Sequence, residues 1–198
     1  MLHLLVATTN PGKIKEITEL LKSTYVKISN LSDFPELQLI NVEEIYETYE
    51  ENALLKARTI GRLSGLITLA DDSGLSVDAL KGKPGVHSKR YGKEDADRIA
   101  KLLTELSQIT QDNRQAHFIC SMVIFDPSSE KYHTAVGRVD GFITTKPAGT
   151  NGFGYDPVFF CPEINKTFGE ATEEEKNQVS HRSKALVGLA QIIRKHYT

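Results

Sequence analysis

The sequence of 198 residues predicts an α/β fold in which helices flank a mixed β-sheet. Its first third alternates strand-like and helix-like segments, and its second half contains two strand-like runs joined by a short turn. Strand–helix alternation produces parallel neighbours, whereas a hairpin produces antiparallel ones. Hydrophobic residues at 39% and charged residues at 25% are typical of a globular core. This length fits one domain, residues 1–198, of two lobes that share a sheet.

The first strand–helix unit has clear boundary signals. Residues 2–7 form an apolar strand-like run, and T-T-N-P-G-K follows it directly. Asn10 suits the N-cap of a helix and Pro11 its first position, where the missing N–H of proline costs nothing. The helix then continues with apolar residues at helical spacing: Ile14, Ile17, Leu20 and Leu21.

The next segment predicts a short strand and a second helix. Residues 25–29 form the strand, and a polar, acidic loop occupies about 33–47. Thr48 and Glu51 make a T-x-x-E capping box, which opens a helix that continues to about residue 64. Gly65 suits its end, because glycine adopts the left-handed conformation without strain.

The rest of the chain keeps this alternation. Residues 66–70 form a short apolar strand that we expect to end at Asp71-Asp72-Ser73-Gly74. A glycine-rich loop, KGKPGVHSKRYG, leads to an amphipathic helix at about 94–107. Two strands, 115–125 and 131–139, are joined by a turn at Asp126-Pro127-Ser128-Ser129. The last helix, at about 181–196, places these apolar residues on one face: Ala185, Leu186, Leu189, Ile192 and Ile193.

Composition excludes several classes of function. The net charge of −2 lacks the basic footprint of a nucleic-acid binder. Cys120 and Cys161 are isolated in the sequence, so neither a zinc site nor a disulfide framework is indicated. No apolar run approaches membrane-spanning length, and the N-terminus has no signal-peptide pattern. We therefore expect a cytoplasmic protein with neither a membrane nor a nucleic-acid polymer as partner.

Two predicted helix starts carry positive charge. Lys13 lies in the first turn of one helix, and His181 and Arg182 lie in the first turn of another. A cation there opposes the helix dipole, and a bound phosphate would reverse that cost. One such lysine is equally well explained as a solvated charge, but two sites favour anion binding. We therefore expect Lys13→Gln or Arg182→Gln to leave the stability of the ligand-free protein unchanged or slightly higher. The first loop matches neither GxxxxGK[ST] nor GxGxxG.

Acidic residues near the third strand suit a metal ion. Asp71 and Asp72 follow an apolar run, and open α/β sheets bind ligands at the carboxyl ends of their strands. Mg²⁺ commonly uses one or two carboxylates together with phosphate oxygens. Asp-Asp-Ser-Gly is also an ordinary turn sequence. Glu43 and Glu44 add acidity upstream, although most acidic pairs are solvated loop residues.

Other polar residues carry weaker signals. Asn52 and Lys56 lie four residues apart on one face of the second helix, and we interpret Lys56 as facing solvent. No Ser-His-Asp arrangement follows from the spacing of the residues around His87, so a nucleophilic role for Ser73 or Ser88 is not indicated.

The run G-F-G-Y-D-P at 152–157 predicts an exposed aromatic loop. Glycines flank Phe153 and permit a sharp bend, which would expose its ring and the Asp156 carboxylate. An exposed ring can stack on a planar base. The alternative is that Phe153 and Tyr155 are core aromatics. Together with the cationic helix starts and the strand-end acid, the loop predicts a pocket for a nucleoside phosphate with Mg²⁺.

These motifs together resemble the inosine triphosphate pyrophosphatase family, and in particular its bacterial-type dITP/XTP pyrophosphatases. ATTNPGKIKE, EENALLKAR, ADDSGLSVDAL, PGVHSKRYG, GTNGFGYDPVFF and EEKNQVSHRSKAL occur in the order typical of that family, over nearly the whole chain. The resemblance implies an elongated mixed sheet, two lobes around a central nucleotide cleft, and a homodimer. It also implies hydrolysis of non-standard purine nucleoside triphosphates (ITP, dITP, XTP) to the monophosphate and pyrophosphate, with Mg²⁺ as cofactor.

The resemblance also implies a role for each motif. Asp72 would be the general base and, with Glu44, a metal ligand, while Ser73 would contact substrate. The phosphate-binding loop would consist of Thr8, Thr9, Asn10, Pro11, Gly12 and Lys13. The rest of the nucleotide would be held by Phe153, Gly154, Tyr155, Asp156, Lys176, His181 and Arg182.

Two departures from the family pattern stand out. The segment EEIYETYEENA lacks the glycine and the Thr-Phe that the family more often has there. Ser88-Lys89-Arg90 stands in place of Ser-Ala-Arg, and we expect Lys89 to face water. Two alternatives remain: a Maf-like pyrophosphatase of pyrimidine or modified nucleotides, and a non-catalytic nucleotide-binding module.

Overall fold

The computed structural model describes residues 2–22 and 26–197, apart from the side chain of Leu20. The helices are α1 (Pro11–Leu21), α2 (Pro35–Gln38), α3 (Tyr49–Ser64), α4 (Asp95–Glu105), α5 (Glu173–Val179) and α6 (His181–His196). The strands are β1 (Leu2–Val6), β2 (Val26–Asn30), β3 (Ile67–Val77), β4 (Gln115–Asp126), β5 (Lys131–Ile143), β6 (Phe159–Cys161) and β7 (Lys166–Thr167). Tyr25, the expected first residue of the second strand, lies outside the described residues.

The strands form one mixed seven-stranded sheet in the order β2-β1-β3-β4-β5-β6-β7. β1 pairs in parallel with β2 and β3, whereas β6 pairs antiparallel with β5 and β7. The predicted α/β class with a mixed sheet is therefore confirmed. By its internal contacts the chain divides into two compact units. Unit 1 comprises Met1–Asp72, Cys120–Gly137 and Arg182–Thr198, and unit 2 comprises Ser73–Ile119 and Arg138–His181.

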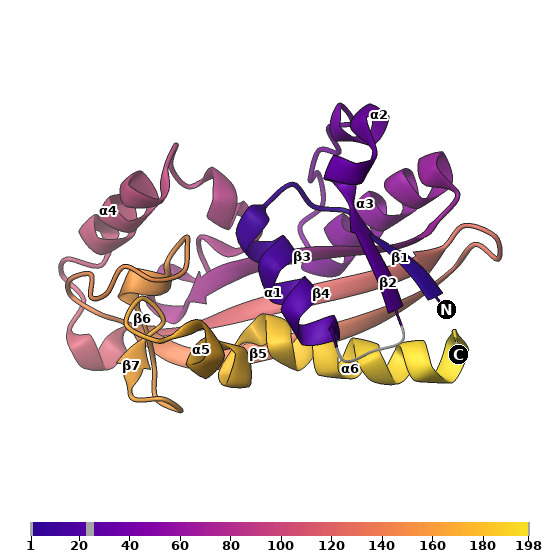
Figure 1. Ribbon diagram of the computed structural model, residues 1–198. Helices are drawn as coiled ribbons and strands as arrows, with labels where there is room; N and C mark the ends of the chain where they lie inside the picture. Colours follow the sequence, from indigo (N-terminus) through magenta and orange to yellow (C-terminus); the bar gives the residue numbers. More distant parts are fainter. Residues whose placement is uncertain (1, 23–25, 198) are drawn as a thin grey trace. The chain divides into compact units, whose positions relative to one another are not determined.

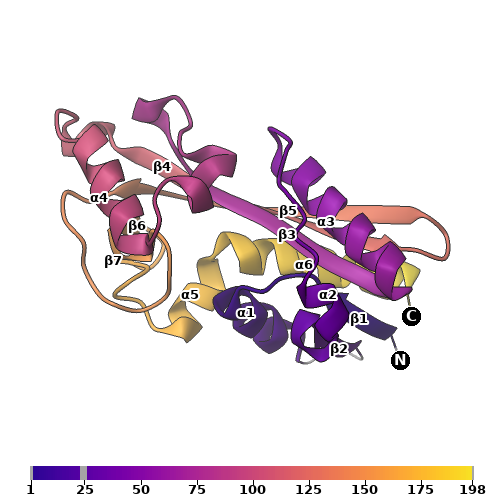
Figure 2. The ribbon, with the colours of Figure 1, turned by 90° about the horizontal axis from the view of Figure 1, so that it is seen from above.

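Unit 1 has helices on both faces of its strands. Alternate residues of β1 point to opposite faces, as the pleat of a strand requires. Leu4 and Val6 pack in a cluster with α1 and α6, whereas Leu5 packs in a second cluster with α3. In Figure 1, α1 and α6 lie in front of these strands and α3 lies behind them. Figure 2 shows α1 and α3 on opposite sides of β3.

Unit 2 has its own apolar core. Three aromatic rings, Phe118, Phe159 and Phe168, pack with centroids 4.7, 5.1 and 6.2 Å apart. Leu102 of α4 and Leu106, which directly follows this helix, belong to the same cluster. Unit 2 therefore packs around one apolar cluster, which is separate from the two clusters of unit 1.

Local sequence signals place the helix ends correctly. The Asn10 side chain accepts hydrogen bonds from the N–H groups of Gly12 and Lys13 at the start of α1. Thr48 caps α3 by accepting the N–H of Glu51, and Gly65 ends it at φ 70°. Short-range chemistry decides these boundaries, so the sequence alone predicts them.

Strand β3 is longer than expected. It continues through Asp71-Asp72-Ser73-Gly74 to Val77, so the prediction of a strand end at this motif is wrong. The strand that does end here is β1: its last residue, Val6, pairs with Leu69, two residues before Asp71. The acidic pair therefore lies in β3, just beyond the carboxyl end of its parallel neighbour.

Three further differences concern the connections. The expected loop at 33–47 contains the short helix α2, which starts at a proline. The hairpin strands are longer than predicted, at Gln115–Asp126 and Lys131–Ile143. Within residues 2–22 and 26–197, none of the helices is both long and apolar enough to cross a membrane.

Candidate functional site

An acidic cluster surrounds one lysine in unit 1. Lys56 Nζ donates to Glu44 Oε1 at 3.0 Å and to the backbone oxygen of Asp71 at 2.5 Å. The same nitrogen lies 3.7 Å from Asp72 Oδ1. The interpretation of Lys56 as facing solvent is therefore wrong. Helix α3 turns its Asn52–Lys56 face towards the acidic part of β3, and helical spacing alone does not reveal which face meets the sheet.

The surroundings of Asp72 raise the pKa of its carboxyl group. Burial raises the pKa of Asp72, and the charges of Glu44 and Asp71 act in the same direction, against the opposing effect of Lys56 and Lys13. Burial alone would lower the pKa of Lys56, but the nearby carboxylates, Asp72 foremost, raise it. Asp72 therefore binds protons more readily than an exposed aspartate, as suits a proton acceptor.

The two carboxylates also fit a divalent metal ion. Glu44 Oε1 and Asp72 Oδ1 both lie close to a single positive charge, Lys56 Nζ. Of the two neighbouring glutamates, Glu44 is half-buried whereas Glu43 is exposed. Among the described residues, no three His, Cys, Asp or Glu side chains gather into a larger site. A pair of carboxylates is the set that Mg²⁺ uses when substrate phosphates and water supply the other ligands.

A second charged network joins α1, β3 and α6. Lys13 Nζ lies 2.7 Å from Asp71 Oδ2, and Arg182 Nε lies 3.8 Å from the same oxygen. Arg182 also donates to the Glu16 carboxylate. Both helix-start cations thus have protein carboxylates as partners, so the expectation that their charges stay uncompensated until a phosphate binds is wrong. Burial alone would raise the pKa of Asp71, but the charges of Lys13, Arg182 and Lys56 hold it well below its usual range.

The N-terminus of α1 is also largely satisfied internally. The N–H groups of Gly12 and Lys13 donate to Asn10 Oδ1 at 2.9 and 3.2 Å, and Pro11 has no N–H. The Asn10 N–H donates to Thr8 Oγ1 at 3.2 Å. A phosphate held by this loop would therefore depend more on side chains than on first-turn N–H groups.

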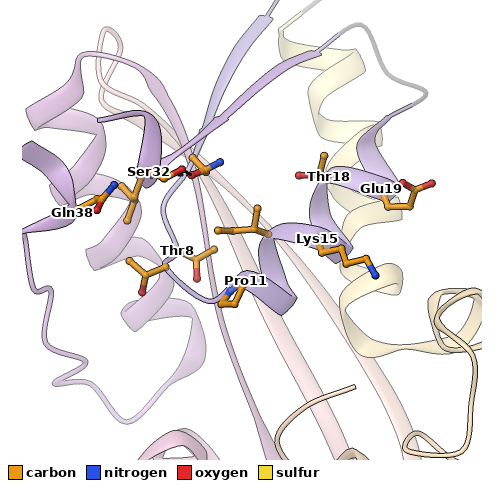
Figure 3. A pocket seen from close by; sticks show the side chains of 11 residues that line it. Thr8, Pro11, Lys15, Thr18, Glu19, Ser32 and Gln38 are labelled. Atoms are coloured by element: carbon orange, nitrogen blue, oxygen red, sulfur yellow. Dashed lines mark hydrogen bonds between the residues drawn. The ribbon is translucent and has the colours of Figure 1, made fainter. Parts of the chain in front are cut away.

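A cavity of about 560 Å³ lies beside the same loop. Thr8 and Pro11 line it from the loop, Lys15 from α1, and Ser32 and Gln38 from the segment that follows β2 (Figure 3). Its lining does not include Lys13 or the acidic pair of β3. The threonines of the loop thus face this cavity, whereas Lys13 contacts Asp71.

The predicted aromatic loop lies in unit 2. Asp156 is 3% exposed, and its Oδ2 accepts hydrogen bonds from Lys176 Nζ at 2.7 Å and from the Phe153 N–H at 2.8 Å. The expectation of an exposed Asp156 is therefore wrong. Gly152, at φ 75°, lets the chain wrap this carboxylate, since a Cβ there would meet Asp156 Oδ2 at 2.0 Å. The Phe153 ring is partly exposed, with Lys176 Nζ 4.8 Å from its centroid.

The other residues of unit 2 take different positions. Tyr155 is buried, as the alternative of a core aromatic predicts, and its hydroxyl donates to the backbone oxygen of Ser88 at 3.0 Å. His181 is buried and stacks on Phe118 with centroids 4.8 Å apart. Ser88 Oγ accepts the Leu75 N–H and donates to a backbone oxygen, so this hydroxyl holds the loop together.

Three further residues have simpler placements. Ser73 is half-buried, directly after Asp72 in β3. Gly154 donates its N–H to Asp95 Oδ2 at 2.7 Å. Lys89 is exposed, as expected.

Sequence reasoning missed Glu16, which carries no motif because its partner Arg182 lies 166 residues away in the chain. Asp71 belongs to an acidic motif, but the motif does not predict its contacts with Lys13 and Arg182. Asn52 and Lys56 did carry a signal, the four-residue spacing, but its direction was misjudged.

Comparisons with known proteins identify the family of this chain. The model of the Ham1 family matches residues 4–192. The chain belongs to the Ham1 family. It is 44% identical over 197 residues to the dITP/XTP pyrophosphatase of Bacillus cereus, covering 98% of this chain and 95% of that protein. It is 47% identical over 192 residues to the dITP/XTP pyrophosphatase of Geobacter sulfurreducens, covering 96% and 95%.

Solved structures of this family share the fold. A Ham1 protein from Coxiella burnetii, 37% identical, has a TM-score of 0.88 and covers 98% of this chain and 100% of its own. The Ham1 protein of Staphylococcus aureus, 35% identical, has a TM-score of 0.85 and covers 98% of both chains.

Proposed function

We propose that this Ham1-family chain hydrolyses the non-standard purine nucleoside triphosphates ITP, dITP and XTP to the nucleoside monophosphate and pyrophosphate. The observation that carries the proposal is the buried Asp72 carboxylate beside Glu44, with one lysine ammonium between their oxygens. Two relatives that are dITP/XTP pyrophosphatases, 44% and 47% identical over nearly the whole chain, support the same substrate class.

In this proposal, unit 1 binds the triphosphate. The loop Thr8, Thr9, Asn10, Pro11, Gly12 and Lys13 would hold the phosphate chain. Glu44 and Asp72 would hold Mg²⁺, which, when bound, offsets negative charge on the pyrophosphate leaving group. Lys13 would exchange part of its contact with Asp71 for a phosphate oxygen, and Arg182 would add a second positive charge.

Unit 2 would bind the nucleoside, with contacts from Ser73, Gly154, Tyr155 and His181. The partly exposed Phe153 ring is suited to stacking on a purine. Asp156 fixes the loop through Lys176, and Tyr155 anchors it to the core. Donors directed at a 6-oxo group would reject 6-amino purines, because a buried donor left without an acceptor is costly.

Hydrolysis needs one proton transfer to protein. Asp72 would orient a water molecule and accept its proton as the water oxygen bonds to the α-phosphorus. The bond from that phosphorus to the α,β-bridging oxygen breaks, and pyrophosphate leaves. On the family resemblance, we also infer a homodimer in the cytoplasm.

A substrate screen tests the proposal. With Mg²⁺, purified protein should release pyrophosphate from ITP, dITP and XTP, and much less from ATP, dTTP or UTP. Preference for dTTP or UTP would favour a Maf-like activity. Tight ITP binding without hydrolysis would show a non-catalytic binding module.

The role of Asp72 has a direct test. Asp72→Asn keeps the shape of the side chain but removes the proton acceptor, so kcat for dITP should fall about 100-fold or more. Asp78→Asn, at an exposed aspartate just beyond the same strand, should behave like the wild type. Near-normal turnover by Asp72→Asn, with its melting temperature unchanged, would remove Asp72 from catalysis.

A further inference from the structure

Asn52 makes three hydrogen bonds that join two parts of the candidate site. Its Oδ1 accepts the Tyr46 N–H at 2.9 Å, and its Nδ2 donates to the Tyr46 backbone oxygen at 3.0 Å. The second N–H of the same Nδ2 donates to Asp72 Oδ2 at 3.2 Å. The side chain is fully buried. One amide thus contacts both the loop before α3 and the acid of β3.

The chemistry of this contact specifies asparagine. The Tyr46 N–H needs an acceptor and its C=O needs a donor, so the orientation of the Asn52 amide is fixed by the loop. That orientation leaves one N–H, which is directed at Asp72. An aspartate carboxylate has no N–H to donate to the Tyr46 backbone oxygen or to Asp72. Glutamine would add a methylene group at a fully buried position.

The loop that Asn52 holds at Tyr46 also carries Glu44. Tyr46 lies two residues after Glu44, whose carboxylate accepts from Lys56, one helical turn after Asn52. Lys56 and Asn52 together hold opposite oxygens of Asp72: Oδ1 lies near Lys56 Nζ and Oδ2 accepts from Asn52. The rotation of the Asp72 carboxylate is therefore fixed from one helix face.

We propose that Asn52 is a positioning residue, which holds the Asp72 carboxylate and the Glu44-bearing loop in the arrangement that hydrolysis requires. The inference rests on the proposed function. Asn52 touches the carboxylate rather than the reacting atoms, so its loss should affect turnover more than binding of the nucleotide.

Two variants and one control test this role. Asn52→Ser removes all three bonds. Asn52→Asp keeps the size and the acceptor for Tyr46 but loses both donors, so it remains informative if Asn52→Ser does not fold. Thr48→Ala removes the N-cap of the same helix without touching Asp72, and it controls for general weakening of this region.

The expected result is a separation of kcat from KM. Both Asn52 variants should lose about 10- to 100-fold in kcat for dITP, as outer-shell partners do, while KM changes by less than about threefold. Hydrogen exchange of the ligand-free Asn52→Ser protein should show a less protected Tyr46 amide. Thr48→Ala should keep kcat within about twofold of the wild type.

Three outcomes would each contradict one of these claims. If both Asn52 variants keep wild-type kcat, or lose no more than Thr48→Ala, Asn52 does not position Asp72. An unchanged Tyr46 amide in Asn52→Ser would show that the loop is held by something else. A wild-type protein that hydrolyses none of ITP, dITP and XTP would instead overturn the proposed function.

Discussion

Arg182 lies 2% exposed between two carboxylates, Glu16 and Asp71, and Lys13 contacts the same oxygen of Asp71 as Arg182 does. Two cations and two carboxylates make this network neutral, which offsets part of the cost of burying each charge. The helix-dipole argument treats Lys13 and Arg182 as isolated charges, and it fails here because their partners come from other elements. A nucleotide phosphate would have to compete with Asp71 for them.

Removing Arg182 should therefore destabilise the ligand-free protein. Arg182→Gln would remove the buried guanidinium that contacts both Glu16 and Asp71, and breaking such a buried pair costs about 3–5 kcal/mol. Urea unfolding without nucleotide measures the change. Arg62→Gln, which breaks an exposed pair with Glu130, should change the unfolding midpoint little. Equal midpoints for Arg182→Gln and the wild type would show that the network does not stabilise the fold.

At the scale of elements, helix α3 makes polar contacts on one face and apolar contacts on another. Asn52 and Lys56 contact the acidic part of β3 and the Glu44 loop. Ala57 and Ile60 pack into the apolar cluster that also contains Phe125 of β4. The position of the polar face therefore depends on how closely the helix approaches the sheet, and Gly61 sets that approach.

Gly61 should not tolerate a methyl group. A Cβ there would lie 2.8 Å from the ring of the fully buried Phe125 and 3.3 Å from Thr68 Oγ1. Gly61→Ala should cost about 1–3 kcal/mol through overpacking, although alanine favours helix. Gly188→Ala in α6, where the nearest atom is Ala135 Cβ at 3.3 Å, provides the matched control and should change stability less. Similar unfolding free energies for the two variants would contradict close packing at Gly61.

At the scale of the whole molecule, the sequence predicts what local chemistry decides. Asn10, Thr48 and Gly65 mark helix ends through contacts within a few residues, and these predictions are confirmed. The extent of β3 and the direction of Lys56 depend on neighbouring strands and on distant carboxylates. No local pattern predicts these features. The resemblance to the family implies roles for such residues, but it does not predict their contacts.

The candidate residues are divided between the two units: Asp72, Glu44 and Lys13 belong to unit 1, and Phe153 and Lys176 to unit 2. The chain passes from one unit to the other between Asp72 and Ser73 and between His181 and Arg182. Under the proposed function, the chemistry of the phosphates and the binding of the base are therefore separable by mutation.

Phe153→Ala should weaken nucleotide binding with little loss of stability. The ring is only partly exposed, but it lies in a turn rather than among the core aromatics of unit 2. Loss of base stacking is worth about 1–3 kcal/mol, whereas removal of a core phenylalanine costs about 3–5 kcal/mol of stability. Calorimetric titration with dITP, in an Asp72→Asn background that prevents turnover, measures the first quantity, and thermal unfolding bounds the second.

Phe160→Ala provides the control, because Phe160 is another partly buried phenylalanine of unit 2, stacked on Phe142 at 4.6 Å. It should leave the affinity for dITP unchanged. If Phe153→Ala also binds dITP with the affinity of its parent, the base does not stack on this ring. If its melting temperature falls as far as that of a core variant such as Phe168→Ala, the ring serves the core. Weaker binding with a nearly unchanged melting temperature would separate base recognition in unit 2 from the charged networks of unit 1.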